Sequence, residues 1–200
     1  LGAREGRFGK KGEPKSLVPF AASSIPLVTL GTFFLWFGWF GFNGFSQLAM
    51  GTFDDVTAIT KIAVNTHLAG AAGVVTGAVV TRLLDSKTDV VMMLNGALAG
   101  LVAITAEPLS PTPGLAILIG SLGSLIMYFG TKFLERRGLD DVVGAIPVHM
   151  FAGIFGTLIV PFSNADTSFG TQFTGVLAIC SFSFILSFII FKILKATVGL

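Results

Sequence analysis

The fold is decided by the stretch SLVPFAASSIPLVTLGTFFLWFGWFGFNGFSQLAMGTF, residues 16–53, which contains no charged residue. Five further long uncharged runs follow it, at 62–81, 90–106, 108–131, 142–165 and 167–191. A helix that crosses a membrane needs roughly 17–25 mostly apolar residues, so each run is long enough for one crossing. The sequence therefore predicts an all-α polytopic membrane protein with six transmembrane helices.

The composition of the 200 residues points to the same class of protein. Charged residues make up 12% of the chain and apolar residues 52%, with a mean hydropathy of +0.83, whereas soluble domains carry about 25% charged residues. The net charge of +2 argues against a nucleic-acid-binding protein. The single cysteine, Cys180, argues against a secreted disulfide scaffold.

We expect the helices at about 24–46, 56–83, 88–105, 112–134, 140–162 and 170–196, with Asp140 and Asp141 capping the fifth. Residues 1–23 are expected to form a cytoplasmic loop, and 24–200 the transmembrane domain. Because the chain begins at Leu1 in a polar segment, we expect an upstream half to precede it. Small-residue spacings predict close helix packing: Gly73/Gly77, Gly96/Gly100, Gly38/Gly41/Gly44 and Gly153/Gly156.

The basic residues predict the orientation of the bundle. All of them except Lys61 fall on one side: Arg4, Arg7, Lys10, Lys11, Lys15, Arg82, Lys87, Lys132, Arg136, Arg137, Lys192 and Lys195. The opposite loops carry only acidic charges: Asp54, Asp55, Glu107 and Asp166. By the positive-inside rule both ends are cytoplasmic. The expected location is the plasma membrane, which in a bacterium is the inner membrane.

Polar side chains at membrane depth are costly and mark candidate sites. His149 follows the expected start of the fifth helix by roughly 13 Å, close to the midplane, beside Pro147. It could line a pore or bond to a neighbouring helix. His67 lies mid-span beside Asn65 and Thr66, which offer interhelical hydrogen bonds, and packing is its favoured interpretation. A metal site is disfavoured because no acidic residue or cysteine lies at ligand spacing from either histidine, and no cofactor is predicted.

The first span carries an aromatic face that ends outside the membrane. At helical spacing this face holds Leu35, Gly38, Trp39, Phe42 and Ser46. A small cation at its outer end could gain from the aromatic rings and donate a hydrogen bond to the serine oxygen. An interfacial aromatic belt explains the same rings equally well.

Several strings together resemble the ammonium transporter (Amt/Mep/Rh) family, on its Amt/Mep branch. They are Gly38-Trp39-Phe40-Gly41-Phe42-Asn43, Leu1-Gly2-Ala3-Arg4, Asn65-Thr66, Asn95-Gly96-Ala97-Leu98-Ala99-Gly100-Leu101-Val102, Asp140-Asp141, Pro147-Val148-His149 and Thr197-Val198-Gly199-Leu200. The resemblance is collinear over nearly the whole chain. It implies the second half, helices six to eleven, of an eleven-helix inverted-repeat fold that assembles as a homotrimer in the lipid bilayer.

The resemblance also implies roles for particular residues. Phe42 matches the outer gate, Ser46 with Trp39 the ammonium recruitment site, and His149 the second of two pore histidines, while His67 matches no functional position. The implied activity is transport, not enzyme catalysis: ammonium is recruited outside, loses a proton, and ammonia passes along the pore. Phe45, Gly144 and Met150 depart from the family pattern.

Two alternatives of a different class stay open. An ammonium sensor of the same fold would bind its ligand with little flux and signal to a partner. A PII-type regulator or a signalling domain beyond Leu200 is the candidate cytoplasmic partner. An intramembrane metalloenzyme that uses His67 and His149 is less favoured and predicts stoichiometric zinc.

Overall fold

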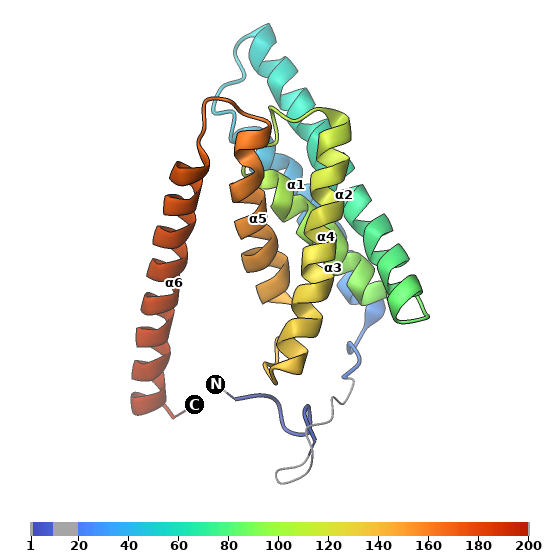
Figure 1. The fold of residues 1–200 in the computed structure, drawn as a ribbon, viewed down its shortest axis with the longest axis vertical. Coiled ribbons are helices and arrows are strands. Elements are labelled where there is room, and N and C mark those ends of the chain that lie inside the picture. Colours follow the sequence, from blue (N-terminus) through green and yellow to red (C-terminus); the bar gives the residue numbers. More distant parts are fainter. Residues whose placement is uncertain (1, 10–19, 200) are drawn as a thin grey trace.

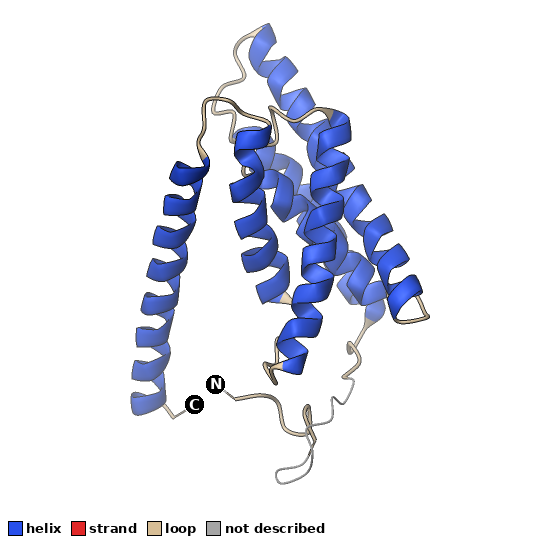
Figure 2. Cartoon of the chain, viewed as in Figure 1, coloured by secondary structure: helices blue, strands red, loops and turns tan. Residues whose placement is uncertain are grey.

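A computed structural model of the chain describes residues 2–9 and 20–199. Leu1, Lys10, Lys11, Lys15 and Leu200, which entered the sequence arguments, lie outside the described residues. Figure 2 shows that the described part of the chain consists of helices and connecting loops, without a strand. The all-α class is confirmed.

The helices follow one another with short connections. They are α1 (Ile25–Phe45), α2 (Phe53–Leu84), α3 (Val90–Thr105), α4 (Pro113–Arg136), a π-helical turn η1 (Ile146–Phe151) that continues into α5 (Ala152–Ile159), the 3₁₀ turn η2 (Val160–Phe162) and α6 (Phe169–Thr197). Ser24, Thr52, Asp89, Thr112 and Ser168 start five of them, each accepting a backbone N–H bond as N-cap.

Successive helical stretches run in alternating directions through the bundle, and the two ends of the chain lie at the same end of it (Figure 1). Four helices, α1, α2, α4 and α6, are long and apolar enough to cross a membrane on their own. The stretches Val90–Thr105 and Ile146–Phe162 are apolar but shorter. Four of the six predicted spans are thus long helices, and the other two are shorter apolar stretches that do not reach the length of a span.

The packed centre of the bundle is formed by α2, α3 and α4, against which α5 also lies. Close approach of backbones explains this packing, because a Cβ atom at Gly73 would overlap the backbone of Gly96, and one at Gly120 would overlap Ala69. By contrast, Gly38 of α1 faces open space. The predicted role of the glycine spacing in packing therefore holds for α2 to α4 and for Gly156 of α5, which lies against Ala103, while Gly38 has no neighbour among the described residues.

The expected start of the fifth helix at residue 140 is wrong. The helical stretch begins at Ile146 with the π-helical η1. Asp141 alone acts as the cap, since its carboxylate accepts bonds from the N–H groups of Gly144, Ala145 and Ile146. Asp140 points elsewhere and pairs with arginine. Gly144 has a φ of +78°, a conformation that an L side chain rarely adopts, and it makes the turn into η1.

Candidate functional site

The C-terminal end of α1, which the distribution of basic residues predicts to lie outside, brings three of the predicted residues together. The rings of Trp39 and Phe42 meet edge to face, with centroids 6.1 Å apart. The hydroxyl of Ser46, the residue that caps α1, donates a 2.8 Å hydrogen bond to the carbonyl oxygen of Phe42. Because its only proton is used in this way, the hydroxyl oxygen of Ser46 is left as an acceptor. An exposed acceptor beside aromatic rings suits a small cation that donates N–H bonds.

The Trp39 ring is held in place by a residue that the sequence arguments missed. Its indole Nε1 donates a 2.7 Å hydrogen bond to Oγ1 of Thr105, at the end of α3. The hydroxyl of Thr105 in turn donates to the carbonyl of Leu101. A threonine in the last turn of an apolar helix has no distinctive sequence pattern, so only the meeting of α1 and α3 reveals this anchor.

The Asn65–Thr66 pair makes bonds beyond its own helix. Asn43 of α1 donates to the hydroxyl of Thr66 at 3.0 Å, and both side chains are buried. The amide of Asn65 donates to the carbonyl oxygens of Pro108 and Pro111 in the loop between α3 and α4. These contacts give both residues a structural role in the described half of the fold.

His149 lies on η1 and is exposed on the surface of the described chain, while its neighbours Pro147 and Val148 are buried. No side-chain hydrogen bond to His149 is present among residues 2–9 and 20–199, and no described ring contact joins it to the outer group of Trp39, Phe42 and Ser46. Turns of π-helix are frequent at functional sites. Pro147 stands in the first turn, where a missing N–H costs no helical hydrogen bond.

His67 is also exposed on the described chain, but its ring makes aromatic contacts that His149 lacks. Its ring lies 5.6 Å from that of Trp36 and 6.2 Å from that of Phe40, centroid to centroid, and it is stacked on Phe40. Both partners belong to α1, so the imidazole contributes to the contact between α1 and α2. In the described part of the chain no three His, Cys, Asp or Glu side chains gather as a metal site would require.

Glu107 joins two loops, the one between α3 and α4 and the one between η2 and α6. The sequence arguments treated Glu107 only as a loop charge. One carboxylate oxygen accepts the N–H groups of Leu109 and Ser110. The other accepts a 2.8 Å bond from the amide of Asn164, between η2 and α6. The loop that follows α3, and with it Thr105, is therefore fixed against the outer end of the fifth helical stretch.

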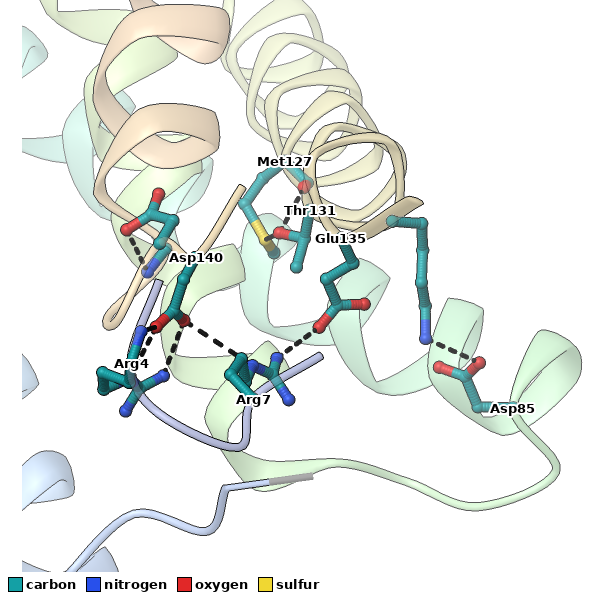
Figure 3. A network of polar contacts seen from close by, with 10 residues as sticks. Arg4, Arg7, Asp85, Met127, Thr131, Glu135 and Asp140 are labelled. Carbon is teal, nitrogen blue, oxygen red and sulfur yellow. Dashed lines mark hydrogen bonds and ion pairs between the residues drawn. The ribbon is translucent and has the colours of Figure 1, made fainter. Parts of the chain in front are cut away.

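The opposite end of the bundle, predicted to be cytoplasmic, carries a cluster that we call the latch: Arg4, Arg7, Glu135 and Asp140 (Figure 3). Arg4 donates to Asp140 through its backbone N (2.9 Å), Nε (2.8 Å) and Nη2 (2.8 Å). Arg7 bonds to Glu135 at 2.9 Å and has its Nε 3.6 Å from Asp140. The hydrogen bonds from the Arg4 side chain lower the pKa of Asp140 to about 2. The sequence arguments assigned Asp140 to a cap and missed this cluster.

Comparison with known proteins identifies relatives over the whole chain. The model of the Ammonium Transporter Family matches residues 1–200. Ammonium transporter Amt2 of Archaeoglobus fulgidus is 40% identical over 174 residues, which cover 87% of this chain and 36% of that protein. The structure of a Sensor Amt Protein matches with a TM-score of 0.89 at 33% identity and covers all of this chain and 50% of its own. Candida albicans Mep2 matches with a TM-score of 0.81 at 26% identity, over 90% of this chain and 43% of that one. The chain thus spans about a third to a half of the length of these relatives.

Proposed function

The chain belongs to the ammonium transporter family, whose members are multi-pass membrane transporters and not enzymes, and from this premise we propose that it forms the second half of a pore that conducts ammonium. The observation that carries the proposal is where this half exposes its functional groups. Phe42, Ser46 and His149 lie on its surface, outside the packed centre of α2 to α4. An imidazole that faced lipid would be costly, so a pore is the better environment for it.

Recruitment would take place at the outer end of α1. The Ser46 oxygen, whose proton is committed to the carbonyl of Phe42, accepts an N–H bond from ammonium, while the rings of Trp39 and Phe42 offer their π faces. Potassium is similar in size but donates no hydrogen bond. The outer site therefore favours ammonium through the direction of its N–H groups.

Beyond Phe42 a bare cation would meet an apolar pore and a large desolvation cost. Ammonium can avoid this cost by giving up a proton, and neutral ammonia then passes His149. A neutral imidazole suits such a pore because one ring nitrogen donates while the other accepts. The proton would travel separately along imidazoles, one of them from the upstream half, which would make transport electrogenic.

The test is the current evoked by ammonium, and by potassium, in membranes reconstituted with the full-length protein. Ser46→Ala removes a hydrogen bond to a charged ligand, worth about 1.5–3 kcal/mol, and so should shift the concentration dependence by roughly tenfold or more. The matched control is Thr57→Ala, because the Thr57 hydroxyl is also exposed and bonds to the carbonyl four residues before it. An unchanged concentration dependence in Ser46→Ala would remove Ser46 from the site.

His149 is tested in the same assay. His149→Ala should abolish the ammonium current, and His149→Asp should relax the selectivity against potassium, since a carboxylate stabilises any small cation. His67→Ala serves as the control histidine and should conduct like the wild type, because its ring packs against Trp36 and Phe40. Wild-type flux and selectivity in both His149 variants would exclude His149 from the pore.

A sensor is the second candidate, and one observation favours it: a structure that matches all of this chain is that of a Sensor Amt Protein. The same outer site would then bind ammonium with little flux. Saturable ammonium binding by full-length protein that carries no current would decide for the sensor, with a partner such as a PII-type regulator or a signalling domain beyond Leu200.

The assembly belongs to the proposal as well. We expect a homotrimer in the plasma membrane with both ends of this segment, residues 1–23 included, on the cytoplasmic side and residues 24–200 in the transmembrane domain. The upstream half would cover exposed surfaces such as α6, none of whose described residues is buried. Native mass spectrometry of the full-length protein decides the assembly, and a stable, active monomer would contradict it.

A further inference from the structure

The latch joins two segments that are far apart in the sequence. Arg4 and Arg7 belong to the segment that precedes α1, whereas Asp140 lies between α4 and η1. The Asp140 side chain is only 3% exposed, and the backbone and the guanidinium of Arg4 both bond to it. A carboxylate this buried is stable only when it is paired and hydrogen-bonded, so the local structure depends on both arginines staying in place.

Asp141, the residue that follows Asp140, caps the start of η1. The Asp141 carboxylate accepts three backbone N–H groups, those of Gly144, Ala145 and Ile146, at 3.1, 3.0 and 2.7 Å. The amide of Asn95, on α3, donates to the carbonyl of Val143 within the same turn. The backbone of residues 140–146 is therefore held by the latch at one end and by the cap at the other.

These anchors act at the start of a helical stretch that runs on from η1 into α5. η1 is a π-helical turn of six residues, a rare form of helix. Pro147 and Val148 pack into the bundle, and the residues before η1 set where the turn begins. Since Asp140 and Asp141 are adjacent, a shift of Asp140 moves the cap and with it the turn that carries His149.

We propose that the latch is a positioning device for the pore: Arg4 and Asp140 act as positioning residues that hold the start of η1, and thereby His149, against the segment before α1. The inference rests on the proposed function in its last step only, the role of His149 in conduction. The holding of η1 by the latch follows from the contacts themselves. Displacement of residues 2–9 from Asp140 loosens η1 and changes the pore from its cytoplasmic side.

The test compares Asp140→Asn, Arg4→Ala and Arg4→Lys in the full-length protein. Lysine keeps the charge of Arg4 and the backbone bond but loses the two parallel N–H donors of the guanidinium. Arg4→Lys should therefore have a smaller effect than Arg4→Ala. The matched control is Asp85→Asn. It breaks the 3.1 Å ion pair between Asp85 and Lys132 of α4 and leaves the contacts of Asp140 unchanged (Figure 3).

The first measurement is hydrogen exchange of the amide protons in residues 144–151. Asp140→Asn and Arg4→Ala should raise their exchange rate by about tenfold, the factor expected for the loss of one charged hydrogen bond. The double variant should exchange no faster than the faster single one, because both changes remove the same contact. Wild-type exchange in all latch variants, or equal acceleration in Asp85→Asn, would overturn the proposal.

The second measurement is the ratio of ammonium-evoked to potassium-evoked current. A loosened His149 should lower this ratio in Asp140→Asn and Arg4→Ala, and Arg4→Lys should lie between them and the wild type. If exchange rises and the ratio stays unchanged, the latch does not position His149. If the wild type carries no ammonium current, the proposed function fails, and exchange alone still decides whether the latch holds η1. Should Asp140→Asn fail to fold, Arg4→Lys keeps both measurements possible.

Discussion

α4 and α6 are both long and apolar enough to cross a membrane, yet their surroundings are opposite. α4 packs against α2, α3 and α5, whereas α6 contacts only α5 and η2 within the described chain and stands apart from the bundle over most of its length (Figure 1). Small side chains account for the close packing of α4, because Gly120 and Gly123 let neighbouring backbones approach. Gly170 and Gly175 of α6 have no such neighbour among the described residues. Apolar character brings a helix into the bilayer, but the shape of its surface decides which helices pack together, because lipid is as apolar as the side chains.

The largest loss of stability is expected from a substitution at a glycine of α4. Gly120→Leu would place a side chain into the backbone of Ala69 and should cost about 3 kcal/mol of folding free energy or more. Gly114→Leu, in the first turn of the same helix, is the control, since nothing lies within 4 Å of a Cβ atom there. Thermal unfolding of the full-length protein measures both. Equal stability of the two variants would show that small residues do not decide the packing.

A smaller effect is expected from the buried polar contact between α1 and α2. Asn43→Ala removes the donor to Thr66 and should cost about 1–3 kcal/mol, because a buried hydroxyl loses its partner. Thr174→Ala on α6 removes an exposed hydroxyl that bonds only within its own helix and should change the stability by less than about 0.5 kcal/mol. Chemical denaturation gives both values, and a neutral Asn43→Ala would contradict the contact.

The latch makes the stability of the fold depend on pH. The folded-state pKa of Asp140, about 2, lies below its ordinary value, chiefly because of the side-chain hydrogen bonds from Arg4. The latch therefore stabilises the fold above about pH 4, and this contribution is lost as the pH falls from there through about 2. Asp140→Asn should be less stable than the wild type at neutral pH and should lose less on acidification. Parallel unfolding curves over this range would argue against the pairing.

The smallest effect is expected outside the packed centre, just after α1. Leu48 has a φ of +59° and its side chain is 92% exposed, so it carries backbone strain without packing. Leu48→Gly should raise the stability by up to about 1 kcal/mol. Leu48→Ala keeps the strained Cβ and should stay at the wild-type value. A loss of stability in Leu48→Gly would reveal a contact that the exposed surface conceals.

Much of the architecture could be predicted from the sequence because its signals are local. The length of each uncharged run and the glycine spacing in α2 and α3 depend only on neighbours in the chain, and the predicted boundaries of five helices lie within a few residues of the observed ones. The outer group of Trp39, Phe42 and Ser46 could be predicted for the same reason. All three residues belong to one helical face at the end of α1.

Patterns along the chain predict a membrane protein of helices, aromatic and hydroxyl groups that meet at the end of α1, and a histidine that follows a proline in the fifth helical stretch. Where that stretch begins depends on tertiary contacts. Asp140 and Asp141 look equivalent in the sequence, but Arg4, 136 positions away, binds one of them and leaves the other to cap η1. Contacts across such distances, like those of Thr105 with Trp39 and Glu107 with Asn164, arise because packed helices bring remote segments together, and no periodicity along the chain records which segments meet.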